Sequence, residues 1–191
     1  MNVSRGMLAG AVTAGLFGVV WAESAAAAVS GPAPAAIRAV AGAAALVIVL
    51  CSARLWRSAA ADMAPGAWAR PMFSSPRYAA IVALQLLAFG GGNALLGAIG
   101  GREYVVAWVA AVIGLHFVAF GRLFWPGFSW LGAALLTASA AGATVGLAGG
   151  GADGIEATTG LIAAASLLIA GGWTVADVAA TAGTHKISPS S

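Results

Sequence analysis

The sequence predicts an all-α protein, a polytopic membrane bundle of six transmembrane helices, and three observations support that prediction. Hydrophobic residues make up 61% of the 191-residue chain, and the mean hydropathy is +0.94. Only 8% of the residues are charged, against about 25% in soluble domains, so the chain has too few charges to cover a water-facing surface. The apolar residues also fall into runs of about 20, the length that spans a bilayer.

Six such runs are separated by proline, glycine or charged residues, and each is predicted to form one helix of a single transmembrane domain. The expected spans are residues 7–28, 35–55, 78–99, 104–121, 128–149 and 156–176. The longest connection, residues 57–77, contains three prolines that break any long helix. Between the third and fourth spans only "GGRE" remains, which predicts a tight hairpin, and residues 179–191 form a polar C-terminal tail.

The first span carries small residues at every fourth position: Gly6, Gly10, Ala14, Gly18 and Ala22. Small residues let helix backbones approach closely in lipid, where packing rather than hydrophobicity drives association. We therefore expect Gly10 and Gly18 on a packing face. An alternative interpretation takes the same stretch as a secretory signal peptide, because a basic start and an apolar core precede small residues. Cleavage would leave five spans.

The second and fourth spans end alike, in Arg-Leu followed by an aromatic residue. The first ending contains Arg54 and Trp56, and the second contains Arg122 and Trp125. Arginine and tryptophan are favoured at membrane interfaces, so these four residues are expected to anchor the inner ends of the two helices. The likeness also fits a repeat of three helical hairpins in one orientation. Convergence at a shared interface is the alternative.

The fifth span repeats the four-residue spacing of small residues: Ala138, Gly142, Gly146 and Gly150. The third span has a similar series with Asn93, Gly97 and Gly101. We expect close helix packing along these stripes. The spacing is equally compatible with a contact inside the bundle and with a face that forms a homo-oligomer.

Apart from Ser and Thr and the charged residues close to the span ends, four polar side chains fall inside the expected spans: Glu23, Gln85, Asn93 and His116. Such groups are costly at membrane depth and usually face the bundle interior or a water-filled cavity, so they are candidates for contact with a solute or a proton. Their depths pair Glu23 with Asn93 in the outer half and Gln85 with His116 in the inner half. The alternative is a structural role, in which interhelical hydrogen bonds hold the spans in register.

The distribution of Lys and Arg predicts that both termini are cytoplasmic. With the N-terminus inside, seven basic residues flank the inner ends of the spans: Arg5, Arg54, Arg57, Arg70, Arg77, Arg122 and Lys186. Only Arg38 and Arg102 then lie on the outer side. The 57–77 connection becomes a cytoplasmic loop whose arginines are expected to contact anionic lipid head groups.

The sequence contains no signature of an enzyme, a metal site or a cofactor site. It has no nucleophile elbow, no His-Glu-x-x-His, no Walker loop and no dinucleotide fingerprint. Cys51 is the only cysteine, and His116 is the only histidine inside a span, so a thiolate cluster and a paired haem ligation are both excluded. The net charge of +3 is scattered along the ends of apolar runs and does not indicate nucleic acid.

At "GLHFVAFGRLF", Gly114 to Phe124, the sequence resembles a group of uncharacterised bacterial six-span integral membrane proteins with a Gly-Leu-His-Phe segment in the fourth span. In those relatives proline and leucine often follow the phenylalanine, whereas Val118 and Ala119 follow it here. The resemblance implies a bacterial inner-membrane protein and supplies no substrate.

Two functional hypotheses follow from these patterns. In the first, the bundle binds or passes a small solute or ion, and the four polar side chains line its interior. In the second, the protein is a non-catalytic membrane scaffold that binds a partner, or a second copy, through its glycine faces.

Overall fold

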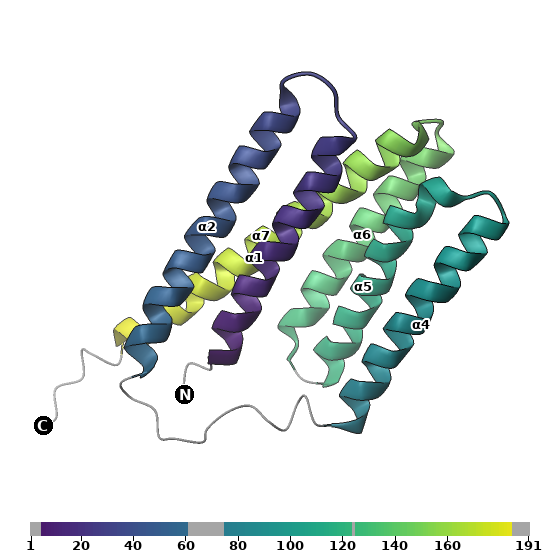
Figure 1. Ribbon diagram of the computed structural model, residues 1–191. Coiled ribbons are helices and arrows are strands. Elements are labelled where there is room, and N and C mark those ends of the chain that lie inside the picture. The colour runs from purple at the N-terminus through teal and green to yellow at the C-terminus, as the bar shows by residue number, and fades with distance from the viewer. Residues whose placement is uncertain (1–4, 61–74, 124, 185–191) are drawn as a thin grey trace, which may run out of the picture.

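The computed structural model describes residues 5–60, 75–123 and 125–184, which form six long helices with no strand among them. The helices are α1 (Arg5–Ala27), α2 (Ala33–Ala60), α4 (Pro76–Ala98), α5 (Val105–Leu123), α6 (Gly127–Leu147) and α7 (Gly151–Thr184), with a short 3-10 turn, η1 (Arg102–Tyr104), before α5 (Figure 1). All six are long and apolar enough to cross a membrane. The predicted all-α fold with six transmembrane helices is therefore confirmed.

Glycine builds the tight turns between successive helices. After α4, Gly100 adopts a φ of +77°, and the backbone N–H of Gly101 donates a hydrogen bond to the carbonyl of Leu96 at 2.8 Å. This arrangement satisfies a free carbonyl at the helix end, and it needs a residue without a Cβ at the left-handed position. The turn between α6 and α7 has the same construction, with Gly149 at a φ of +86°.

Helix α7 is the longest helix, with 34 residues, and it begins before and ends after the apolar run at 156–176. At 1.5 Å per residue it is about 51 Å long, well beyond the ~30 Å hydrocarbon core of a bilayer. Figure 1 shows it running obliquely behind α1. Residues 179–184 of the expected polar tail thus continue the helix, and residues 185–191 lie outside the described part of the chain.

Helix α7 joins two groups of helices. It packs against α1 and α2 on one side and against α5 and α6 on the other, while no described residue of α1 or α2 comes into close backbone contact with α4, α5 or α6 (Figure 1). Helix α4 packs only against α5 and η1 among the described elements. The most extensive packing pairs α1 with α7 and α5 with α6, so it crosses the boundaries of the three expected hairpins.

The core contains small residues and a few large ones. One cluster combines Trp21 and Ala22 of α1 with Ala110 of α5, Leu135 of α6 and Ala163 of α7. Many large apolar side chains point outward instead, including Leu87 at 72% and Trp130 at 81% exposure. Such a surface is incompatible with water but suits lipid, which explains why the small residues are the ones that face other helices.

Candidate functional site

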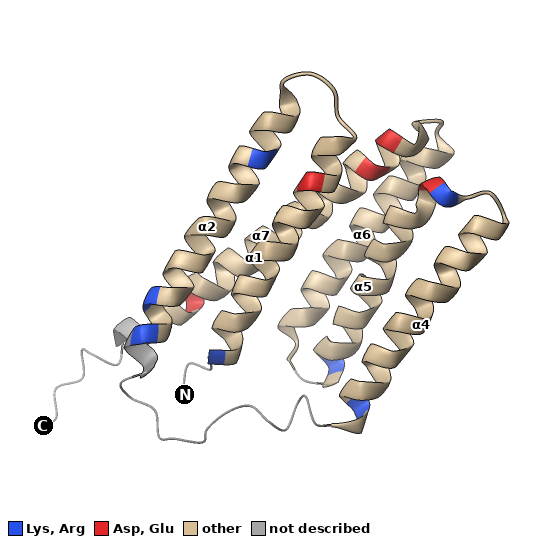
Figure 2. Ribbon diagram, in the orientation of Figure 1, with Lys and Arg blue, Asp and Glu red and all other residues tan. Residues whose placement is uncertain are grey.

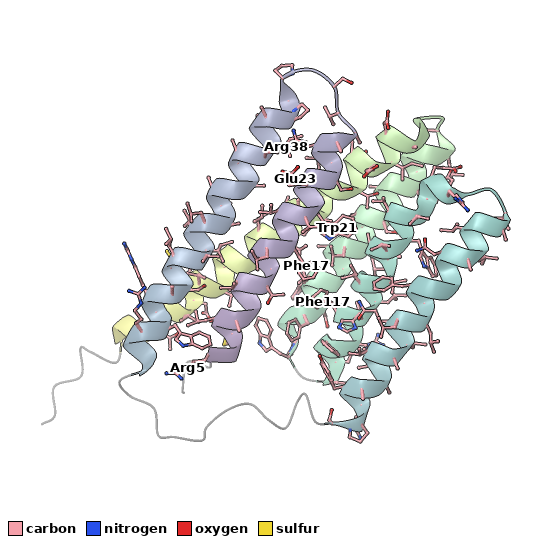
Figure 3. The ribbon with its side chains drawn as sticks, viewed as in Figure 1. Arg5, Phe17, Trp21, Glu23, Arg38 and Phe117 are labelled. Carbon is pink, nitrogen blue, oxygen red and sulfur yellow. The ribbon has the colours of Figure 1, made fainter. Side chains whose placement is uncertain are left out.

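At one end of the bundle Glu23 is paired with a basic residue. The Nε of Arg38 on α2 donates a hydrogen bond to Oε2 of Glu23 on α1 at 2.8 Å. Figure 3 shows the two side chains facing each other between the helices. Both are about half exposed, at 46% for Arg38 and 50% for Glu23. The carboxylate is therefore charge-balanced by its neighbour.

A second polar contact at the same end ties α1 to α7. The Ser24 hydroxyl donates to Oε1 of Glu156 at 2.6 Å. Figure 2 shows most acidic residues at this end of the bundle and most Lys and Arg at the opposite end. Sequence analysis did not single out Arg38, Ser24 or Glu156 for the site. The available signal was that Glu23 and Arg38 lie at similar distances from a short turn, which places them at equal depth on adjacent helices.

Asn93 does not share a site with Glu23. It is exposed on α4, a helix that has no close backbone contact with α1 in the described structure. Gln85 lies on the half-buried side of α4, which faces α5. His116 is on α5, but its buried Nδ1 has no hydrogen-bond partner among the described residues, so Gln85 does not orient the imidazole through that atom.

The His116 imidazole instead lies among aromatic rings near the ends of α4, α5 and α6. Its ring centroid is 4.1 Å from that of Phe120 and 5.7 Å from that of Phe117. Phe120 in turn stacks on Tyr78 of α4 at 5.5 Å, and Phe117 stacks on Phe128 of α6 at 5.7 Å. These surroundings provide apolar packing and no second ligand, so His116 is built into a contact between helices.

The contact between α4 and α5 depends on a different tryptophan. The Trp108 indole N–H donates to the carbonyl of Ala88 at 3.0 Å. A methyl group added at Gly92 would overlap the same indole. Of the three consecutive glycines in α4, Gly92 is therefore the one that admits α5, whereas Gly90 and Gly91 have no neighbouring atom within 4 Å of an added methyl.

The predicted packing glycines have different environments. Gly18 faces Leu168 of α7, Gly142 faces Thr159 and Ile155, and Gly146 faces Ile155 and Tyr104. Gly150 lies in the turn after α6 beside Val145, and Gly10 has no neighbour within 4 Å. The buried small residues of α1 are Ala11, Gly15, Gly18, Ala22, Ala25 and Ala26. The structure differs from the expected stripe because an α-helix advances 400° in four residues, so a strict four-residue series drifts off the contact face.

The predicted interface anchors are all near the helix ends that carry most of the basic residues. Arg54 is exposed about two turns before the end of α2, and Arg122 is exposed in the last turn of α5. Trp125 packs edge-on against Phe128, with ring centroids 5.4 Å apart. Trp56 lies beneath the guanidinium of Arg5, whose Cζ is 5.4 Å from the ring centroid. Most of the 57–77 loop, residues 61–74, lies outside the described residues.

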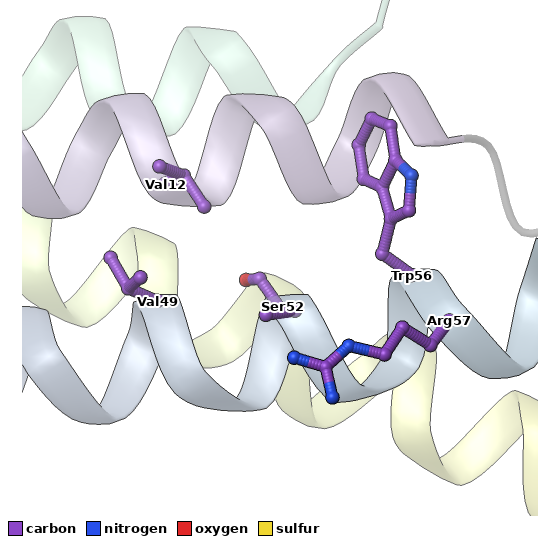
Figure 4. Close-up of a pocket in the computed structure, with 6 residues that line it drawn as sticks. Val12, Val49, Ser52, Trp56 and Arg57 are labelled. Atoms are coloured by element: carbon purple, nitrogen blue, oxygen red, sulfur yellow. The ribbon is translucent and has the colours of Figure 1, made fainter.

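A groove separates α1 from α2 at this same end. Figure 4 shows side chains of α1 and α2 on its two sides. It has a volume of about 320 Å³ and is lined by Val12, Val49, Ser52, Ala53, Trp56 and Arg57. Ser52 is only 2% exposed, and its hydroxyl has no hydrogen-bond partner in the described structure. The described residues contain no group of three His, Cys, Asp or Glu side chains that would hold a metal ion.

No protein-family model, curated protein or solved structure matches this chain. The class of the protein therefore rests on its own architecture. Six apolar helices of membrane-spanning length, with their large side chains directed outward, define a multi-pass integral membrane protein in contact with lipid.

Proposed function

We propose that this protein is a non-catalytic membrane protein that associates with a second copy of itself through the exposed face of α4. The observation that carries the proposal is the low burial of this helix. In the most apolar 18-residue stretch of α4 only 6% is buried inside the structure, compared with 22–33% of the corresponding stretch in each of the other five spans. Helix α4 is therefore anchored to the bundle along a narrow stripe, and most of its surface is available to a partner.

The exposed face of α4 has the features of a helix-packing surface. Asn93 is exposed, and Gly90 lies one turn earlier on the same side with no atom within 4 Å of an added methyl. In lipid, small residues allow close approach, and an amide without a partner is costly. An asparagine offers both donors and an acceptor, so two copies related by a two-fold axis can pair Asn93 with Asn93.

The solute-binding hypothesis has weaker support from the same geometry. Its four candidate side chains do not converge on one site. Glu23 is paired with Arg38, and Asn93 is exposed on α4. Gln85 lies on the half-buried side of α4, and His116 lies among aromatic rings. A pathway needs polar groups that line one continuous space. A scaffold or partner-binding role needs only the exposed surface, and it requires no catalytic residue.

Disulfide crosslinking in the native membrane tests the association. In a Cys51→Ala background, Asn93→Cys should form a covalent dimer under mild oxidation. Val40→Cys is the matched control, because Val40 is 69% exposed on α2 and lies at a comparable depth in the outer half of the bundle. Equal crosslinking of the two variants would refute α4 as the interface.

A steric pair of variants gives a second test. Gly90→Leu should abolish self-association measured by energy transfer between labelled copies in liposomes, because the leucine blocks close approach. Gly42→Leu on α2 is the control, since Gly42 is also exposed and has no atom within 4 Å of an added methyl. Asn93→Val should weaken association about eightfold, from two interhelical hydrogen bonds of about 0.6 kcal/mol each. Association that survives Gly90→Leu would contradict the proposal.

The proposal places the protein in a bacterial inner membrane with both termini cytoplasmic. Support for the membrane comes from the resemblance at Gly114 to Phe124. Support for the orientation comes from the basic residues in the described part of the chain, because five lie where α1 begins, α2 ends, α4 begins and α5 ends: Arg5, Arg54, Arg57, Arg77 and Arg122. A C-terminal green fluorescent protein fusion should fluoresce, and a C-terminal alkaline phosphatase fusion should be inactive.

A further inference from the structure

We infer that the groove between α1 and α2 is a binding site for one anionic phospholipid, with an acyl chain between the helices and the phosphate at Arg57. The site is independent of the α4 surface. Arg57 lies in the last turn of α2, and arginine at the end of a spanning helix is favoured at the membrane interface. The groove extends from Arg57 into the apolar region, to Val49 on α2 and Val12 on α1.

The shape of the groove fits an acyl chain. Val49, Ser52, Ala53 and Trp56 line its α2 side, and their spacing of three or four residues places them on one helix face. From Arg57 to Val49 the helix rises about 12 Å: about 7.5 Å from Arg57 to Ser52 for the phosphate and glycerol, and about 4.5 Å from Ser52 to Val49 for the first carbons of the acyl chain. A groove of about 320 Å³ with apolar walls along this depth favours a lipid over a free phosphate.

The charge at the mouth of the groove selects an anionic head group. Arg57 is exposed and forms no ion pair with any described acidic residue. Arg54 is exposed one turn earlier on α2, and Arg5 of α1 lies over the Trp56 ring on the groove wall. The acidic residue on α7 at this end of the bundle is Asp177. The local balance is positive, so a lipid phosphate is attracted to this mouth.

Ser52 provides independent evidence for a ligand. Its side chain lines the groove between Val49 and Trp56, is 2% exposed, and has a hydroxyl without a hydrogen-bond partner among the described residues. A buried hydroxyl without a partner is unfavourable. A glycerol or ester oxygen below the phosphate would supply the missing acceptor, at the depth where a phospholipid carries these groups.

Native mass spectrometry of the full chain in detergent, with phosphatidylglycerol and phosphatidylcholine added separately, tests the site. The wild-type protein should retain phosphatidylglycerol preferentially. Arg57→Gln should weaken that binding about fivefold, the equivalent of about 1 kcal/mol for one basic residue at the interface. Arg77→Gln should leave it unchanged, because Arg77 is a basic residue at the same end but lies on α4, a helix that does not line the groove.

A groove-filling variant tests the acyl chain separately. Ala53→Phe should weaken phosphatidylglycerol binding at least tenfold, the equivalent of about two methylene groups losing their contacts. If Ala53→Phe loses the helical circular dichroism signal and is therefore unfolded, Val49→Phe on the same wall of the groove is used in its place.

Three results would overturn the inference. Equal loss in Arg57→Gln and Arg77→Gln would assign the effect to general surface charge. Wild-type affinity in both filled variants would show that the groove is unused. Displacement of the lipid by millimolar glycerol 3-phosphate would show that the head group alone is bound.

Discussion

The contact between α6 and α7 gives the sharpest test of how this bundle is held together. A methyl group added at Gly142 would overlap the Oγ1 of Thr159, and it would lie 3.1 Å from the Ile155 carbonyl oxygen and 3.2 Å from the Thr159 Cβ. Both positions are buried, so neither the methyl group added at Gly142 nor the Thr159 side chain can turn towards lipid. We expect Gly142→Ala to destabilise the protein by about 1–3 kcal/mol through overpacking.

The comparison with Gly42→Ala on α2 removes the effect of helix propensity. Alanine is favoured over glycine inside a helix by up to about 1 kcal/mol, and this gain applies at both positions. Gly42 is exposed, has no atom within 4 Å of an added methyl and lies outside the proposed interface, so its substitution reports the propensity alone. The difference between the two variants, measured by reversible unfolding in mixed SDS micelles, therefore isolates the overpacking at Gly142.

The double variant Gly142→Ala/Thr159→Ala completes the test. Removing the Thr159 hydroxyl relieves the overlap but leaves its Cβ close to the new methyl, so about half of the lost free energy of unfolding should return. The expected coupling is about 1 kcal/mol, above the ~0.3–0.5 kcal/mol scatter of additive pairs. Equal stabilities for Gly142→Ala and Gly42→Ala, or an absence of coupling, would refute close packing of α6 on α7 at this position.

Three further variants test the other contacts. Glu23→Gln should lower the free energy of unfolding by at most about 0.5 kcal/mol, because the ion pair with Arg38 is half exposed. A double-mutant cycle at low and high salt measures the coupling between Glu23 and Arg38, and a coupling that persists in high salt would contradict the prediction. His116→Phe should retain or slightly raise the unfolding free energy, because it removes a buried nitrogen without a partner among the described residues. A loss above about 1 kcal/mol would contradict this prediction. Gly92→Ala should lower the protection of α4 amides from hydrogen exchange, because its methyl displaces the α5 indole, whereas Gly91→Ala should not; equal protection in the two would contradict the proposed α4–α5 contact.

The fold could be predicted from the sequence because it depends on properties that single residues reveal. Run length and composition specify which segments cross the bilayer, and glycines at positions such as Gly100 specify where the chain turns. These signals need no knowledge of which helices are neighbours. The prediction of six spans succeeded for that reason.

The partners of the polar side chains could not be predicted in the same way. The span boundaries predict how deep each side chain lies in the membrane, and they place Glu23 at the same depth as Asn93. Depth alone does not specify which helix lies opposite. The partner of Glu23 is Arg38 on the adjacent helix. The burial of α4 was equally hidden, because a helix that is apolar on all sides has no stripe that distinguishes protein from lipid.

The packing face of α1 is visible in the sequence, but at a mean spacing of 3.5 residues and not at the four-residue spacing used for the prediction. The buried positions Ala11, Gly15, Gly18, Ala22 and Ala25 are separated alternately by four and three residues. Their mean spacing of 3.5 residues is that of two helices in sustained contact. A search for small residues at that period, rather than at every fourth position, would have found the face that contacts α2 and α7.

The position of α7 also has a consequence for how the protein is made. Helix α1 has its most extensive contact with α7, the sixth of the six long helices described, and about 120 residues separate the two in the chain. At a translation rate of about 5–20 residues per second, the small-residue face of α1 waits roughly 6–24 s for its partner. During that interval the α1–α2 hairpin and the α4–α6 segment are inserted without a helix to join them. Helix α7 can therefore join the two halves only after both have been synthesised.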